Sequence, residues 1–189
     1  MKKLTKNLRI SNNMYKLLID CTSNYLIIAL IKDSNLLFSL KKDNAKNHTE
    51  NALEEIIKMI KHNNLNKEDI GQLLVVSGPG SFTGIRVALT IAKTWKIWNP
   101  SIQLFSTNSF LLNSFGRNEV KIRANRYEVY FANVDNLKLS NVQTKRDQES
   151  ISDYESFDLE KIDLSYLLNC FLEVKKLEDF QPFYFKGVI

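Results

Sequence analysis

Glycine, proline, cysteine and histidine are all scarce in this chain of 189 residues, which holds six, three, two and two of them. The two cysteines, Cys21 and Cys170, form no Cys-x-x-Cys pair, so we expect reduced thiols and no disulfide framework. No apolar run approaches the ~18 residues that a transmembrane helix needs. The composition therefore favours a cytoplasmic globular protein with no membrane partner.

The scarcity of histidine limits the metal chemistry that the chain can support. His48 and His62 are about four helical turns apart, roughly 21 Å along a straight helix, so they cannot share a metal ion there. No histidine lies beside the candidate nucleophiles Cys21, Ser81 and Thr83 in the sequence. We therefore predict no metal site and no catalytic residue.

Acidic residues are absent from the first thirteen positions, which carry Lys2, Lys3, Lys6 and Arg9. This segment supplies most of the net charge of +5. A basic tail can touch nucleic acid, and this one lacks the apolar core of a signal peptide. We expect residues 1–13 to form a basic disordered extension.

Three of the six glycines lie in one stretch, residues 77–84, which runs Ser-Gly-Pro-Gly-Ser-Phe-Thr-Gly. An apolar run at 73–76 precedes it, and a helical pattern with Ser81 as its N-cap follows. The stretch therefore predicts a strand, a glycine turn and a helix. Such a turn can hold an anion at the helix N-terminus, or its glycines can let strand and helix pack closely. The known phosphate loops do not fit, because no lysine follows Gly84 and Thr83 replaces the third glycine of the dinucleotide fingerprint.

Strand and helix patterns alternate along most of the chain. Three strands joined by short turns, at 17–20, 25–31 and 36–40, suggest an antiparallel meander. The later elements that we expect are a helix at 47–62, a short capped turn at 66–69, strands at 73–76 and 102–105, helices at 81–98 and 109–115, a hairpin of 119–124 with 127–134, a helix after Asp163 and a terminal strand at 181–186. The apolar face expected on the first helix consists of Leu53, Ile56, Ile57 and Ile60. Between 136 and 163 the pattern is weak.

The glycine stretch and the two residues after it resemble the signature of the bacterial TsaB family, also known as YeaZ-like proteins. The matching residues are Gly78-Pro79-Gly80-Ser81-Phe82-Thr83-Gly84-Ile85-Arg86. Weaker similarity covers the first strand and its turn at 18–22, the helix start at 48–50, the strand at 128–130 and the segment 182–186. The family pattern is broken at Arg123 and Asn125, where Asp and Arg are usual, and at Ala88, Thr90 and Thr94, which replace glycines of the central helix.

The resemblance implies an α/β fold of the actin-like, Hsp70-like ATPase class (ASKHA) in degenerate form, with two similar subdomains of which the second is reduced. An order of three strands, helix, strand, helix and strand fits the first half of such a domain. We therefore expect a first subdomain at 14–116 that carries the glycine loop and a reduced second subdomain at 117–189.

The same resemblance implies a function without catalysis. It is that of a subunit for the synthesis of N6-threonylcarbamoyladenosine on tRNA, which binds and supports the catalytic homologue TsaD as a heterodimer. TsaE and TsaC would act in the same pathway, and tRNA would be a partner only indirectly. The isolated chain could form a homodimer through the same helices. No cofactor is required for this function, although ATP or ADP could bind at the partner interface.

The resemblance also suggests roles for single residues. The candidates for contacting an anion or nucleotide are Gly78, Pro79, Gly80, Ser81, Phe82, Thr83, Gly84 and Arg86. Asp20 is a candidate remnant of a phosphate site, although actin-like ATPases follow this acid with glycine where Cys21 begins a turn here. The candidates for the partner surface, on two helices, are His48, Ile57, Ile60, Ile85, Leu89 and Ala92.

Two other functions stay open from the sequence. The first is an ATP-binding or ATP-hydrolysing actin-like enzyme, and the missing glycine after Asp20 counts against it. The second is a peptidase-related protein, and the lack of a closely spaced metal-ligand pair or a local catalytic dyad counts against that.

Overall fold

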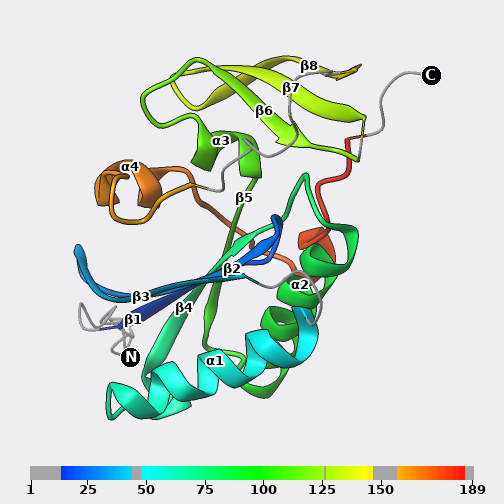
Figure 1. Ribbon diagram of the computed structural model, residues 1–189. Coiled ribbons are helices and arrows are strands. Elements are labelled where there is room, and N and C mark those ends of the chain that lie inside the picture. Colours follow the sequence, from blue (N-terminus) through cyan, green and yellow to red (C-terminus); the bar gives the residue numbers. More distant parts are fainter. Residues whose placement is uncertain (1–13, 44–47, 126, 147–156, 186–189) are drawn as a thin grey trace, which may run out of the picture.

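The computed structural model describes residues 14–43, 48–125, 127–146 and 157–185, and the statements below concern those residues. The predicted extension at 1–13 lies outside them, as does the expected helix start at Asn47. Figure 1 shows a six-stranded sheet with two long helices on one side and a second, three-stranded sheet on the other.

The six-stranded sheet is mixed, with the order β3-β2-β1-β4-β5-β9. Its strands are β1 (Tyr15–Asp20), β2 (Tyr25–Lys32), β3 (Asn35–Asp43), β4 (Ile70–Val76), β5 (Gln103–Thr107) and β9 (Leu172–Glu173). The first three form the predicted antiparallel meander. β4 and β5 continue the sheet in parallel with β1, so the carboxyl ends of these three strands share one edge.

The helices lie on both faces of this sheet (Figure 1). On one face are α1 (His48–His62), the short 3-10 helix η1 (Lys67–Asp69) and α2 (Phe82–Trp98); on the other are α3 (Ser109–Asn113) and α4 (Leu164–Asn169). Asp163 is the N-cap of α4, as predicted, because its carboxylate accepts a hydrogen bond from Tyr166 N at 2.7 Å. None of the helices in the described ranges is long and apolar enough to cross a membrane.

Two apolar cores lie on opposite faces of the six-stranded sheet. Along β1, Leu17 and Ile19 point into the core under α1 and α2, whereas Leu18 points into the core shared with α3, α4 and the second sheet. Alternation with a period of two explains this division. Because both faces are covered, the central strands are apolar at nearly every position.

The second sheet has the order β6-β7-β8, with β6 (Glu119–Arg123), β7 (Glu128–Asp135) and β8 (Lys138–Arg146). The predicted hairpin is β6 with β7, whereas β8 falls in the region where the sequence pattern was weak. One face of this sheet packs on the core through Val120, Ala132 and Val134. The other face is turned away from the six-stranded sheet (Figure 1).

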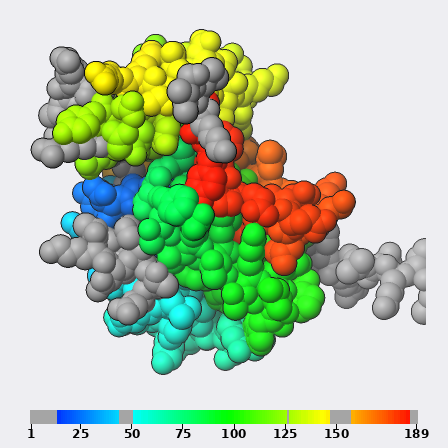
Figure 2. Space-filling view, turned by 90° about the vertical axis from the view of Figure 1, so that its right-hand side faces the viewer, coloured from blue at the N-terminus to red at the C-terminus, as the bar shows by residue number. Residues whose placement is uncertain are grey.

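The segment after β9 runs back across the molecule (Figure 2), where it lies between α2 and the second sheet. It contains the short 3-10 helix η3 (Leu177–Asp179), and Phe180 is fully buried in the core under α1 and α2. The predicted terminal strand is wrong over the described residues 181–185. The segment is held instead by Phe183 N, which donates to Ser77 O at 2.8 Å, and by aromatic contacts.

Candidate functional site

The loop between β4 and α2 turns sharply at two glycines. Gly78 and Gly80 have φ angles of 109° and 152°, which other residues rarely adopt. A Cβ on Gly80 would also overlap the carbonyl oxygen of Thr22. Ser81 is the N-cap of α2, as predicted, because its hydroxyl accepts a hydrogen bond from Gly84 N at 3.2 Å.

Gly84 brings the first turn of α2 against the turn that follows β1. A Cβ at this position would overlap the carbonyl oxygen of Cys21. Beside it, Ser81 N donates to Thr22 O at 2.7 Å. Gly84 therefore allows the backbones of the two turns to approach each other closely. A contact of this loop with an anion or nucleotide stays a prediction.

Three loops meet at the carboxyl ends of the parallel strands β1, β4 and β5. Ser109, which follows β5, joins the other two loops, because its backbone N donates to Gly78 O at 2.7 Å and its hydroxyl donates to Thr22 Oγ1 at 3.2 Å. Ser77, which follows β4, donates its hydroxyl to Thr107 O at the end of β5, at 2.8 Å. Ligands of open α/β sheets bind at this kind of edge. Here many of the buried polar groups are bonded to one another.

Asp20 ends β1, as predicted, and its side chain is buried beneath these loops. Its Oδ1 accepts a hydrogen bond from Thr22 N at 2.7 Å. Burial raises the pKa of the carboxyl from 3.8 to about 6, and the hydrogen bonds from Thr22 oppose that rise. The carboxyl therefore titrates near neutral pH while it holds its own turn. Its descent from a phosphate site stays a prediction.

Cys21 and Ser81, two of the three candidate nucleophiles, are not activated in this arrangement. Cys21 is buried, and desolvation followed by the charge of Asp20 raises the pKa of its thiol. The hydroxyl of Ser81 is occupied as the helix cap. Within the described ranges, no group of three or more His, Cys, Asp and Glu side chains could hold a metal ion. The side chain of His48 lies outside what the structure describes.

An exposed aromatic and cationic cluster lies at the start of α2. The rings of Phe82 and Tyr184 are stacked with centroids 5.6 Å apart. The guanidinium of Arg86 lies 3.8 Å from the centroid of the Phe82 ring, and its Nε donates to Tyr184 OH at 3.2 Å. The loop residues Phe82 and Arg86 are therefore brought together, as candidates for one site. Tyr184 was not predicted to join them, because nothing local in the sequence pairs positions so far apart.

The outer sides of α1 and α2 carry large apolar side chains. Leu53 and Ile57 on α1, and Ile97 and Trp98 at the end of α2, are 51%, 44%, 70% and 47% exposed. Lys67 Nζ lies over the Trp98 ring, 3.8 Å from its centroid. Exposed large apolar side chains on neighbouring helices are candidates for an interaction surface. These four side chains are called the helix surface below.

Most of the predicted partner residues are not part of the helix surface. Ile85, Leu89 and Ala92 are buried in the core beneath α2, so their assignment to a partner surface is wrong. Ile60 packs partly against the same core, and Ile57 is exposed as the prediction requires. A helix that rests on a sheet turns one apolar stripe inward, and these three α2 residues are that stripe.

On α1 the expected apolar face is split between core and solvent. The residues that enter the core are Ala52, Ile56 and Met59, whereas Leu53 and Ile57 face outward. Spacings of four and three place Ala52, Ile56 and Met59 on one side of the helix. Ala52 marks the side of α1 that faces the core, and a prediction from the large aliphatic residues alone overlooks it.

The fold defines the class of protein first: an α/β protein built on a mixed sheet, with a glycine loop between a strand and a helix. The structure described as "YeaZ from Pseudomonas aeruginosa" matches it with a TM-score of 0.68 at 14% identity. The match covers 91% of this chain and 100% of that chain. At that identity the likeness shows the fold.

The family follows from the sequence. The family model described as "TsaD: tRNA N6-adenosine threonylcarbamoyltransferase" matches residues 41–147, which is more than half of the chain, and the chain belongs to this family. Relatives named TsaB and the YeaZ fold make it a TsaB/YeaZ-like member, which confirms the resemblance seen in the glycine loop.

Two relatives show how far the similarity reaches. The "Uncharacterized protein MG208 homolog" of Mycoplasma pneumoniae is 39% identical over 121 residues, 62% of this chain and 62% of its own length. The "tRNA threonylcarbamoyladenosine biosynthesis protein TsaB" of Bacillus subtilis is 30% identical over 89 residues, 47% of this chain and 38% of its own length. The chain thus spans less than two thirds of these relatives.

Proposed function

We propose that this chain is a non-catalytic subunit in the synthesis of N6-threonylcarbamoyladenosine on tRNA, and that it binds and supports TsaD. The helix surface is the observation that carries this proposal, because it exposes apolar side chains on two neighbouring helices. The pathway is suggested by the relatives whose printed name is tRNA threonylcarbamoyladenosine biosynthesis protein TsaB.

Removal of the helix surface from water would drive such a complex. Apolar area contributes about 25 cal/mol per Å² when it is buried, and tryptophan is among the residues that dominate binding energy at interfaces. Trp98 and Ile97 therefore form the proposed centre of the contact, flanked by Leu53 and Ile57 of α1. The isolated chain would use the same surface to form a homodimer.

The proposed lack of catalysis rests on the buried groups at the carboxyl end of β1. Asp20 holds its own turn, and the raised pKa of Cys21 keeps that thiol protonated. We propose that the chain works without a metal or a required cofactor, and that ATP or ADP binds only at the interface with TsaD. TsaE and TsaC are the proposed further members of the pathway.

A degenerate actin-like fold with a reduced second half fits a non-catalytic scaffold of this kind. The second sheet has three strands against six in the first, which supports the reduction.

Co-purification with TsaD from the same organism tests the proposed contact. We expect the parent chain to co-purify, and Ile57→Ser with Trp98→Ala to weaken the complex at least tenfold without lowering the melting temperature, because both side chains are exposed. The matched control is Leu172→Ser on the edge strand β9, which is 74% exposed. A parent chain that does not bind TsaD, or a helix-surface variant that binds as the parent does, would refute the proposal.

A reconstituted modification assay tests the proposed role. With TsaC, TsaD, TsaE, ATP, threonine, bicarbonate and tRNA present, product should require this chain but should persist with Asp20→Asn. The isolated chain should neither hydrolyse ATP nor modify tRNA. ATP turnover that follows the purified chain and disappears in Asp20→Asn would identify it as an enzyme instead.

A further inference from the structure

Phe82, Arg86 and Tyr184 form a compact group on the surface, called the arginine cluster below. The Phe82 ring is stacked on the Tyr184 ring, and the Arg86 guanidinium lies over Phe82 while its Nε donates to Tyr184 OH at 3.2 Å. All three side chains stay accessible, because Phe82 and Tyr184 are 55% and 44% exposed and Arg86 is exposed as well. The cluster is therefore ordered by its own contacts and still open to a partner.

The charge of Arg86 has no counter-ion among the residues that the structure describes. None of the ion pairs in those ranges includes Arg86, and its side chain donates there only to the neutral Tyr184 hydroxyl. The sequence of α2 contains Lys93 and Lys96 but no acid, and the described end segment 181–185 has no charged residue. The guanidinium therefore keeps donors that a carboxylate from outside the chain could use.

The arginine cluster lies on the same side of α2 as part of the helix surface. Arg86 and Ile97 are eleven residues apart, which is close to three helical turns and about 16 Å along the axis. Thr90, between them, is also exposed and is small. Figure 2 shows α1, α2 and the segment 177–185 on one face of the molecule. A partner that rests on the helix surface can therefore lie along α2 as far as the cluster.

We propose that the arginine cluster is a second anchor for TsaD, in which Arg86 pairs with a carboxylate of that partner. This anchor rests on the proposed function, and it adds a charged contact at the opposite end of α2 from Trp98. Tyrosine and arginine are among the residues that dominate binding energy at interfaces. The guanidinium is a planar fork that holds a carboxylate by two hydrogen bonds, so an acidic side chain of TsaD is the group that it fits.

Tyr184 is the positioning residue of this anchor. It belongs to the segment that returns to the glycine loop, and Phe183 N fixes that segment by donating to Ser77 O at 2.8 Å. The hydroxyl of Tyr184 and the ring of Phe82 hold the guanidinium in place before the partner arrives. A side chain that is ordered in advance loses less conformational entropy on binding. Tyr184 therefore contributes to the contact through Arg86.

A titration of labelled TsaD with the full chain, followed by fluorescence anisotropy at several salt concentrations, tests the anchor. The test variant is Arg86→Gln, and the control is Arg117→Gln, which removes the same charge from an exposed position beyond α3. We expect Arg86→Gln to bind at least tenfold more weakly at low salt, because docking takes this charge pair out of water. The difference from the parent should shrink as salt rises. The control should bind as the parent does, and both variants should keep the parent's melting temperature because both arginines are exposed.

Tyr184→Phe tests the positioning role. It keeps the ring that stacks on Phe82 and removes the hydroxyl that holds Arg86, so we expect a loss of about threefold in affinity for TsaD. When Tyr184→Phe is combined with Arg86→Gln, it should cause no further loss, because its effect passes through the guanidinium. Additive losses would show that Tyr184 contacts TsaD itself, which would overturn its assignment as a positioning residue.

Three results would overturn the inference while the proposed function stands. They are an Arg86→Gln variant that binds TsaD as the parent does, a loss that is the same at every salt concentration, and a control that loses as much as the test variant. A homodimer of the chain that dissociates in Arg86→Gln, with binding to TsaD unchanged, would assign the cluster to a second copy instead. The proposed function fails differently, because the parent chain then shows no binding to TsaD at any salt concentration, and the anchor fails with it.

Discussion

The two sheets of this protein are packed differently, and they differ in how readily their strands can be predicted from the sequence. The central strands of the six-stranded sheet are covered on both faces, and Leu17, Leu18 and Ile19 of β1 are all fully buried. The three-stranded sheet is packed on one face, and its edge strand β8 contains no buried residue. A strand covered on both sides appears as an apolar run, whereas a polar edge strand leaves little periodicity to detect. Tolerance to substitution should follow the same division.

The largest expected effect is at the loop of the covered sheet. Gly84→Ala places a Cβ against the Cys21 carbonyl, which is backbone and cannot swing aside, so α2 or the β1 turn must shift. We expect a loss of about 3 kcal/mol or more in the free energy of unfolding, at the upper end of overpacking effects. Urea titration of the purified variant measures it.

Gly116→Ala is the matched control for Gly84→Ala. Gly116 has a φ of 74°, but a Cβ there would meet nothing within 4 Å. Only backbone strain remains, at about 1 kcal/mol. If Gly116→Ala destabilises the protein as much as Gly84→Ala, close approach of the two backbones is not what the loop glycine provides.

The second effect is a gain, because Asp20 is a carboxyl in the covered sheet. Its pKa is about 6 in the folded chain and 3.8 when unfolded, so the unfolded state ionises first as pH rises. This residue therefore lowers the stability of the folded protein progressively from about pH 4 to pH 6, by up to roughly 3 kcal/mol, and the loss persists above pH 6. Asp20→Asn should remove that loss and keep the hydrogen bond from Thr22 N.

Urea titrations of parent and Asp20→Asn at pH 4, 5, 6 and 7.5 test this expectation. The stability of the variant minus that of the parent should rise between pH 4 and pH 6 and then level off. A difference that is constant with pH would show that the carboxyl is not desolvated in the folded state.

A smaller effect is expected in the layer between the two sheets. Tyr166 OH on α4 donates to Leu111 O at 3.1 Å and lies 2.7 Å from Ser114 Oγ. Tyr166→Phe removes these interactions but keeps the ring, so we expect a loss of about 1 kcal/mol in thermal or urea unfolding. Ser114 still donates its own hydroxyl to Leu111 O at 2.8 Å. A loss as large as that of Gly84→Ala would show that this layer tolerates substitution as poorly as the covered sheet does.

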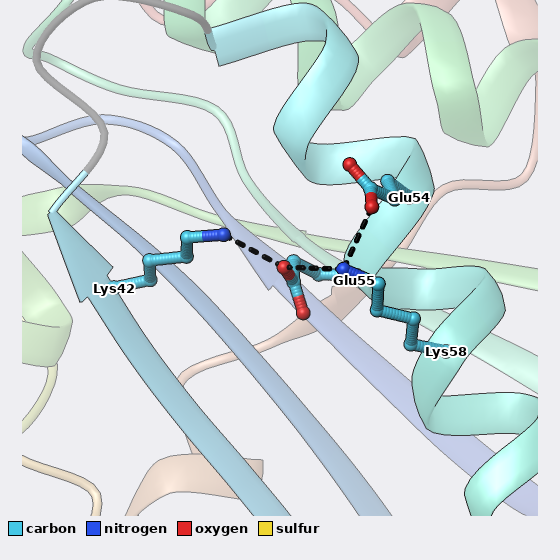
Figure 3. A network of polar contacts seen from close by, with 4 residues as sticks. All are labelled: Lys42, Glu54, Glu55 and Lys58. Atoms are coloured by element: carbon cyan, nitrogen blue, oxygen red, sulfur yellow. Dashed lines mark hydrogen bonds and ion pairs between the residues drawn. The ribbon is translucent and has the colours of Figure 1, made fainter.

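The smallest effect is expected at the ion-pair network of Figure 3. Glu55 on α1 accepts from Lys42 Nζ of β3 at 2.8 Å and lies 3.4 Å from Lys58 Nζ, which also pairs with Glu54 at 2.7 Å. The hydrogen bond from Lys42 is the main cause of the lowered pKa of Glu55. Its contribution to stability is therefore present at neutral pH and lost as pH falls through that lowered pKa.

Glu55→Gln should reduce the free energy of unfolding by less than about 1 kcal/mol at neutral pH, because the lysines remain solvated. Glu54→Gln, at a more exposed position of the same network, should be close to silent. Both are measured by urea titration at low and high salt. A larger effect of Glu54 than of Glu55 would mean that the link from α1 to β3 contributes nothing.

The same contrast explains how much of the structure could be predicted. The meander, the glycine turn and the caps at Ser81 and Asp163 were predictable because each depends on neighbours within a few residues. β8 was missed because Leu139 and Val142 are its only apolar residues, so its sequence has neither an apolar run nor an apolar alternation. The strand expected at 181–186 is not formed over the described residues 181–185, where Tyr184 and Phe185 make ring contacts with Phe82 and Tyr130 in place of a ladder.

The candidate site was predictable in part for the same reason. The loop residues, Asp20 and the apolar character of α1 and α2 can each be recognised from a short stretch of sequence. The groups that complete the site, Ser109 and Tyr184, are brought there by the topology, and no spacing in the sequence pairs them with the loop. The side of each helix that faces outward depends on how it rests on the sheet, which is why Ile85 was assigned to the surface in error.

The return of the chain after α4 has a consequence for how the protein folds. β9 extends the six-stranded sheet beyond β5, and Phe180 fills the core under the long helices, so the first half is completed by residues roughly seventy or more positions further along the chain. Closing so long a loop costs entropy before its contacts are gained. The two sheets are therefore expected to form a single cooperative unit with a high contact order, in which neither half reaches its final packing before the other.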